Sequence, residues 1–346
     1  MADLTHTSQT IKKIGPPIII FLIIVILIGI TIFRLTRKSE TRLGPISPPL
    51  ITQNPEQKQP RNFDFSAARI EEIPKTLPVY SIAPYNITET AAITLASSLG
   101  FQGNPTSTKD SASNGEEFNW SVSDRSLTVG QTNLEYRNKE YRKRLSLPFE
   151  ALSQEELKNE AVSFMGKITL LGQDIELKNT KYQIILGNDR APVANFEDAQ
   201  IVEFSFDKKV ANIPLIDNYP GSGFTKLRVF KDGQVIYLFS QFFEKFSESG
   251  FYKLKTADES IEEIRRGQGK VVRAQVLSDK GVPKNIYEHP ENIDNAKIEK
   301  VSLAYFLPND LKEAVQPIFV FEGGFKTNQN ENGEVVIYLP AIKQNK

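Results

Sequence analysis

The stretch TADESIEEIRRG, residues 256–267, predicts a helix with a defined start and a defined end. Thr256 and Glu259 have the spacing of a capping box, in which each side chain accepts a hydrogen bond from a free backbone N–H. Gly267 suits the left-handed conformation that ends many helices. Strand-like apolar runs follow the helix at residues 270–277, 298–306, 317–325 and 334–339. This order predicts one helix packed on a small antiparallel sheet.

The same order of elements occurs twice earlier in the chain. Residues 88–100 open with Thr88 and end with Gly100, and residues 153–166 open with Ser153 and carry Glu156 three residues later. Strand-like runs follow both segments. We therefore predict an α+β fold in which tandem helix-plus-antiparallel-sheet modules occupy residues 70–150, 151–250 and 251–346.

Two short polar segments predict hairpin turns inside these modules. Lys231-Asp232-Gly233 separates the apolar runs 227–230 and 235–238. Residues 328–333, NQNENG, separate the last two runs of the chain. Asp and Gly favour the backbone conformations of tight turns, so each pair of runs is expected to form an antiparallel hairpin.

The N-terminal part carries a long apolar segment. Residues 18–33, IIIFLIIVILIGITIF, contain no charged side chain. As a helix, residues 14–35 would be roughly 33 Å long, which is enough to cross a bilayer core. The segment runs directly into basic residues and lacks the small-residue cleavage site of a signal peptide. We therefore predict an N-terminal tail at 1–13 and a single-pass signal-anchor transmembrane helix at 14–35 in the lipid bilayer of a cell membrane.

A polar, proline-rich segment follows the apolar one. Residues 43–62, LGPISPPLITQNPEQKQPRN, predict a semi-extended spacer within residues 36–69. The basic residues on the two sides of the apolar segment nearly balance, and long domains cross membranes with little regard to so small a difference. Because spacers of this kind lift a domain off a membrane surface, we expect the C-terminal domain to be extracytoplasmic.

The composition excludes several kinds of chemistry. The chain has no cysteine, and its basic and acidic residues number 42 each. Disulfides, thiolate nucleophiles and cysteine-bound metals are therefore absent, and no net charge favours nucleic acid. Of the two histidines, His289 is predicted to be a surface-loop residue. We predict no nucleic-acid partner, no metal or other cofactor, and no enzymatic activity.

The last module carries a family resemblance. Residues 301–306, VSLAYF, residues 316–321, QPIFVF, and residues 335–341, VVIYLPA, follow a helix that ends in Gly267-Gln268-Gly269. This order resembles the PepSY-like modules of bacterial extracytoplasmic proteins and is similar to the YycI-type membrane-anchored regulators of a cell-envelope sensor kinase. The resemblance implies one N-terminal transmembrane helix, tandem modules outside the cell, a regulatory role and no shared catalytic residue.

The final strand-like run suggests a partner-binding edge. Little follows residues 334–339, so this strand is expected at a sheet edge, where unpaired backbone groups can recruit a strand from another protein. Phe325, Val336 and Tyr338 are then the candidate partner-binding residues. The alternative is a central strand with no free edge.

The densest basic run of the C-terminal part suggests a second kind of ligand. Its cations, interleaved with two tyrosines, are Arg137, Lys139, Arg142, Lys143 and Arg144. Such a run can bind an anionic polymer through charge and stacking, or it can be a solvated linker. Residues 217–223, DNYPGSG, are a weaker candidate that is either a ligand loop or a plain turn.

Two functions remain open at this stage. The first is a non-enzymatic envelope protein that binds or regulates another cell-envelope protein. The alternative is an envelope domain that binds a glycan or an anionic polymer. Loss of binding with added salt would favour the polymer, whereas a stoichiometric complex in detergent would favour a protein partner.

Overall fold

The computed structural model describes the C-terminal part of the chain. The described residues are 44–53, 57–109, 115–145, 148–168, 175–187, 189–220, 223–284, 290 and 292–344. The chain divides into two compact units, Met1–Gly44 and Pro45–Lys346, and almost all described residues belong to the second. The predicted tail at 1–13 and anchor at 14–35 lie outside the described residues. No helix within the described ranges is long and apolar enough to cross a membrane.

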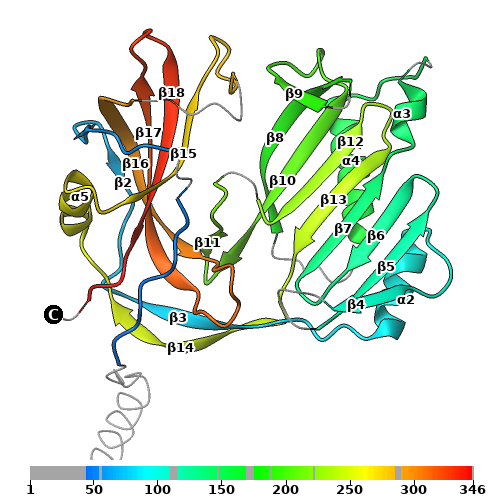
Figure 1. Ribbon diagram of the computed structural model, residues 1–346, viewed down its shortest axis with the longest axis horizontal. Coiled ribbons are helices and arrows are strands. Elements are labelled where there is room, and N and C mark those ends of the chain that lie inside the picture. The colour runs from blue at the N-terminus through cyan, green and yellow to red at the C-terminus, as the bar shows by residue number, and fades with distance from the viewer. Residues whose placement is uncertain are drawn as a thin grey trace, which may run out of the picture. The chain divides into compact units, whose positions relative to one another are not determined.

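The predicted fold class is wrong. Of the described residues, 48% lie in strands and 13% in helices. Hydrogen bonds join most of the strands into one mixed sheet of 16 strands, in place of three separate helix-plus-sheet modules (Figure 1). The predicted helices at 88–100, 153–166 and 256–267 are present as α2 (Glu89–Ser98), α4 (Gln154–Gly166) and α5 (Ala257–Arg265).

The first part of this sheet, which we name the central sheet, is antiparallel throughout. Its order is β9-β8-β10-β12-β13-β7-β6-β5-β4. The strands are β4 (Thr106–Lys109), β5 (Glu116–Val122), β6 (Arg125–Val129), β7 (Asn133–Asn138), β8 (Ile175–Leu186), β9 (Asp189–Val193), β10 (Ile201–Val210), β12 (Thr225–Phe230) and β13 (Val235–Gln241). The pairing of β7 with β13 joins the first two predicted modules into one sheet.

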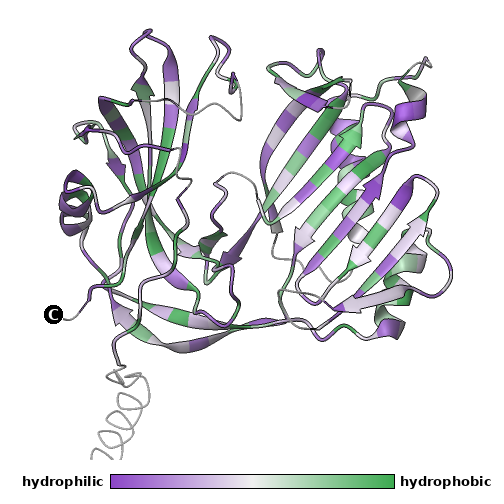
Figure 2. Ribbon diagram, viewed as in Figure 1, coloured by the Kyte–Doolittle hydropathy of each residue, from purple (hydrophilic) through white to green (hydrophobic). Residues whose placement is uncertain are grey.

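One face of the central sheet is covered by α2 and α4 (Figure 1). Leu157 of α4 and Ala92 of α2 are fully buried in one hydrophobic cluster with Leu127, Leu134 and Leu227 of the sheet. Hydrophobic and hydrophilic residues alternate along these strands (Figure 2). Because successive side chains of a strand point to opposite faces, charged and polar side chains of these strands lie on the second face. That face also carries a small buried cluster of Ile201, Phe230 and Ile236, against which Tyr141 of the segment after β7 packs.

The second part, which we name the C-terminal sheet, has the order β15-β18-β17-β16. Its strands are β15 (Lys270–Val276), β16 (Asn295–Phe306), β17 (Gln316–Lys326) and β18 (Asn332–Pro340). Apolar side chains are buried on both faces, for example Val335 and Ile337 on one and Val336 and Tyr338 on the other. The hairpins predicted around 231–233 and 328–333 are confirmed as β12–β13 and β17–β18.

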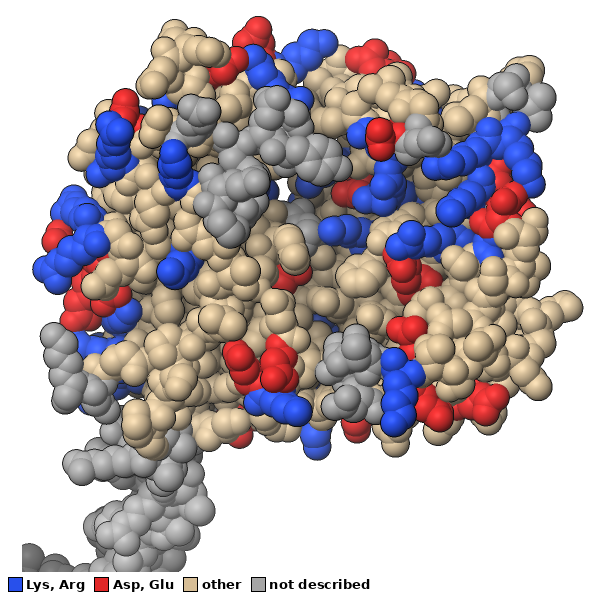
Figure 3. Space-filling model, viewed as in Figure 1, with Lys and Arg blue, Asp and Glu red and all other residues tan. Residues whose placement is uncertain are grey.

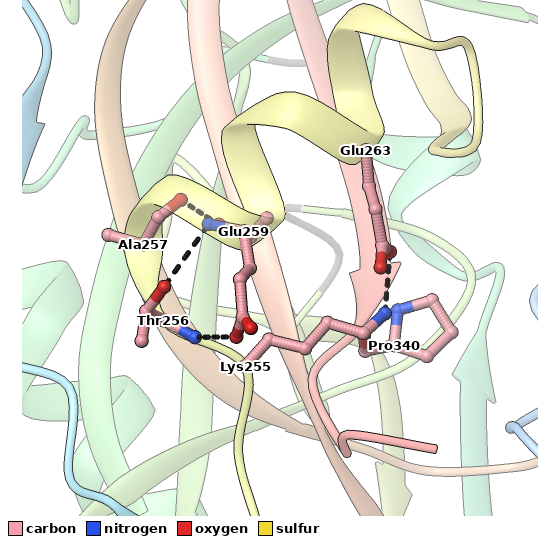
Figure 4. Close-up of polar contacts among 7 residues, drawn as sticks. Lys255, Thr256, Ala257, Glu259, Glu263 and Pro340 are labelled. Atoms are coloured by element: carbon pink, nitrogen blue, oxygen red, sulfur yellow. Dashed lines mark hydrogen bonds and ion pairs between the residues drawn. The ribbon is translucent and has the colours of Figure 1, made fainter. Parts of the chain in front are cut away.

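Helix α5 begins with the predicted capping box (Figure 4). The Glu259 N–H donates to Thr256 Oγ1 at 3.2 Å, and the Thr256 N–H donates to Glu259 Oε2 at 2.9 Å. Beside it, Lys255 Nζ forms an ion pair with Glu263 at 2.6 Å and donates to the Pro340 carbonyl at 2.9 Å. These contacts fix α5 against the end of β18. The capping box at Ser153 and Glu156 is likewise present in α4.

The two sheets are joined by a short strand and by a ribbon. β11 (Ile213–Ile216) forms a hairpin with β10 and pairs in parallel with β16. The ribbon consists of β3 (Thr76–Ala83) and β14 (Lys245–Lys253), which pair antiparallel. In the chain, β3 precedes the strands of the central sheet and β14 follows them. Tyr305 of β16 is fully buried and donates its hydroxyl to the Pro78 carbonyl at 2.9 Å.

Parts of the predicted spacer are packed. β1 (Asn62–Asp64) and β2 (Arg69–Ile70) pair in parallel with β16. Ile51 is only 7% exposed and contacts the Tyr338 side of the C-terminal sheet. Gln316 Nε2 donates to the Ser47 carbonyl at 2.8 Å. The described parts of this proline-rich segment therefore pack against the C-terminal sheet.

Candidate functional site

The expected partner strand lies inside the C-terminal sheet. β18 pairs with β15 on one side and with β17 on the other. Phe325, Val336 and Tyr338 have exposed fractions of only 5%, 3% and 1%. The prediction of a free edge at residues 334–339 is wrong, because β15, which precedes β18 in the chain, pairs along its outer side. The three side chains offer no accessible surface for strand addition.

The weaker candidates have structural roles or lie outside the described residues. In the loop at 217–220, Asn218 Oδ1 accepts a hydrogen bond from the Thr52 N–H, and the Pro220 carbonyl accepts one from Arg273 Nη1, both at 2.9 Å. The loop thus holds the N-terminal segment and β15, as a plain turn does. His289 lies outside the described residues. Across the part that the structure describes, no group of three or more His, Cys, Asp or Glu could hold a metal.

The basic run at 137–144 is divided between two elements. Arg137 lies in β7, whereas Arg142, Lys143 and Arg144 lie in the short helix α3 (Tyr141–Arg144), with Lys139 exposed between them. Lys143 Nζ forms an ion pair with Asp124 at 2.5 Å, and this hydrogen bond raises the pKa of Lys143. The run is therefore not one continuous patch.

Arg137 belongs instead to a row of side chains on the face of the central sheet that lies opposite α2 and α4. We name this the open face. Leu227 and Val229 of β12 pack toward the helices, so the alternate residues Lys226 and Arg228 lie on the open face. Pairing between neighbouring strands sets five residues, one from each of five strands, in a row across the sheet. In order across the strands they are Arg137, Tyr237, Arg228, Glu203 and Lys181.

The centre of this row is a stacked and ion-paired arginine. Arg228 Nε donates to Glu203 Oε2 at 2.6 Å, and the exposed fractions of the two side chains are 16% and 6%. The Arg228 guanidinium carbon lies 4.5 Å from the centroid of the Tyr237 ring. Arg137 contacts the same ring at 6.0 Å and pairs with Glu135 at 2.7 Å. Such cation–π contacts hold both guanidinium groups beside the ring.

Three cations of this face, Lys181 at the end of the row and Arg190 and Lys226 beside it, have no carboxylate in an ion pair with them within the described residues. Burial, partly opposed by the carboxylate of Glu203, lowers the pKa of Lys226. Partial burial and repulsion from Arg228 lower the pKa of Arg190. Figure 3 shows Lys and Arg side chains gathered over the region where α3, β9, β12 and β13 lie in Figure 1.

Sequence reasoning found Arg137 and missed the rest of the row. Lys226 and Arg228 alternate with apolar residues in TKLRVF, residues 225–230, and Glu203 does so in IVEFSF, residues 201–206. Charged residues at every second position of a strand indicate a polar face, so the strand period carried this signal. Which strands lie side by side depends on long-range pairing that the sequence does not reveal.

The open face is suited to binding oxyanions. Arginine donors in a planar fork match carboxylate and phosphate groups, and lysines add positive charge around them. The Tyr237 ring adds a flat surface in the same row. The only buried carboxylate that the structure describes in this row, Glu203, is already paired with Arg228.

Comparison with known proteins does not assign the chain to a family. The resemblance of residues 256–342 to PepSY-like and YycI-type modules stays a prediction. No protein-family model matches the chain, and no curated protein matches it significantly.

Proposed function

We propose that this chain is a membrane-anchored, non-enzymatic protein whose extracytoplasmic domain binds an anionic polymer on the open face. The observation that carries the proposal is the set of cations Lys181, Arg190 and Lys226, which lie together without ion-pair partners in the described residues. This favours the polymer, the alternative ligand expected from the sequence, over a protein captured at β18, because β18 has no free edge.

The open face carries positive charge that no ion pair among the described residues compensates. A cation that loses part of its hydration without forming an ion pair raises the free energy of the folded chain. Lys226, which is half-buried, is in this situation, and the like charge of Arg228 adds to it. An anionic ligand would relieve this repulsion, and a polymer with repeated charges can contact several of these cations at once.

Membrane attachment rests on the apolar segment 18–33 and its length. We expect single cysteines at Ser47 and Gln329 to react with a membrane-impermeant thiol reagent in intact cells, because both positions are exposed and the domain is proposed to lie outside. The natural chain has no cysteine, so it is the blank control. Labelling that occurs only after lysis would place the domain in the cytoplasm.

The polymer proposal predicts salt-dependent binding. The full chain, in nanodiscs of zwitterionic lipid, is expected to bind polyphosphate or polygalacturonate and to leave neutral dextran unbound. Because binding releases counterions from the polymer, raising the salt concentration fourfold should weaken binding by roughly tenfold or more. Titration calorimetry at several salt concentrations measures this. Equal retention of neutral and charged polymers, or no binding of either polyanion at low salt, would contradict the proposal.

A further inference from the structure

The donors of Arg228 are not equivalent in this structure. Its Nε donates to the buried Glu203 carboxylate at 2.6 Å, and its guanidinium lies against the Tyr237 ring at 4.5 Å. In the described residues, Nη1 and Nη2 have no hydrogen-bond partner. The contact with Glu203 therefore uses one donor and leaves the two terminal nitrogens free.

The surroundings of Arg228 hold the guanidinium in one orientation. Glu203 is 5% exposed, and Tyr237 is half-buried on the neighbouring strand. A buried ion pair keeps its geometry because separating the charges inside the protein is unfavourable. The aromatic ring restrains the guanidinium further through the cation–π contact. An arginine held in this way loses little further conformational entropy when a ligand binds.

We infer that Arg228 binds one oxyanion of the polymer through Nη1 and Nη2, and that Glu203 is a positioning residue for this contact. The inference rests on the proposed function and specifies how the same face recognises its ligand. The bound group is a phosphate or a carboxylate, which share the two oxygens that a guanidinium fork contacts. Lys226, on the same strand, and Arg190 add positive charge around the bound group.

Two variants distinguish binding by a positioned Arg228 guanidinium from binding that depends on positive charge alone. Arg228→Lys keeps the charge and loses the fork, so we expect roughly tenfold weaker binding of polyphosphate or polygalacturonate with an unchanged salt dependence. Glu203→Gln removes a negative charge from the face. Charge alone would then strengthen polyanion binding, whereas loss of the positioning contact should weaken it. Lys253→Arg, which changes an exposed cation of β14 outside the central sheet, serves as the matched control and should bind like the natural chain.

The measurement is the dissociation constant of each polymer for the full chain in nanodiscs, together with the melting temperature of each variant. Comparing polyphosphate with polygalacturonate shows which oxyanion Arg228 prefers. Tighter binding by Glu203→Gln, or unchanged binding by Arg228→Lys, would overturn the inference while leaving the proposed function intact. If Glu203→Gln fails to fold, Arg228→Lys alone decides. If the natural chain binds neither polyanion, the proposed function itself fails.

Discussion

Replacing Gly323 with alanine is expected to destabilise the folded chain by about 3 kcal/mol or more. Gly323 lies in β17 opposite Ile298 of β16. A Cβ atom at this position would overlap the carbonyl oxygen of Lys297 and lie 2.9 Å from the Ile298 Cα. Both are backbone atoms of the paired strand, so relief requires the two strands to move apart.

The neighbouring glycine provides the matched control. A Cβ atom at Gly324 would meet only the Gly333 carbonyl oxygen, at 3.3 Å, and a small adjustment removes that contact. Gly324→Ala should therefore change the stability by less than about 1 kcal/mol. Urea unfolding of the two variants measures the difference. Equal unfolding midpoints would show that β16 and β17 do not approach as closely as the structure describes.

Local features of this fold could be predicted from the sequence, and long-range ones could not. The hydrogen bonds of the capping boxes at Thr256 and Ser153 join residues only three positions apart, so the local sequence is enough to predict them. The pairing of β7 with β13 joins residues about a hundred positions apart, and no local pattern specifies it. The order of a helix followed by strands occurs three times in the sequence and therefore suggested three separate modules. In the structure, strands from all three segments pair into one sheet.

The candidate site shows the same division. Arg137 stood out because it belongs to a dense run of cations. The residues beside it in the row, Tyr237 and then Arg228, come from strands much later in the chain. Val336 and Tyr338 were expected to be accessible because little of the chain follows the last strand-like run, which suggested a sheet edge. The C-terminal sheet is buried on both faces, with Ile51 of the predicted spacer covering one of them.

Polyanion binding is expected to depend on three cations of the open face. Lys181→Glu, Arg190→Glu and Lys226→Gln together remove the cations that lack ion-pair partners. Lys181 and Arg190 are exposed, and Lys226 is replaced by a neutral side chain of similar length, so the fold should be retained. With about 1 kcal/mol for each cation near an anionic surface, polyanion binding should weaken by roughly a hundredfold.

A control variant removes the same net charge elsewhere. Lys245→Glu, Lys253→Glu and Lys270→Gln change exposed cations of β14 and β15, outside the central sheet. If polymer binding depended only on the total charge of the protein, this variant and the open-face variant would lose equal affinity. If binding occurs on the open face, the control should stay within a few-fold of the natural chain.

A side-by-side measurement of the polyphosphate dissociation constant for these two triple variants, with melting temperatures recorded for both, tests whether the polymer binds on the open face. We expect roughly a hundredfold loss of affinity for the variant at Lys181, Arg190 and Lys226 and nearly unchanged affinity for the control. Equal loss in both folded variants, or retained affinity in the open-face variant, would contradict binding on the open face.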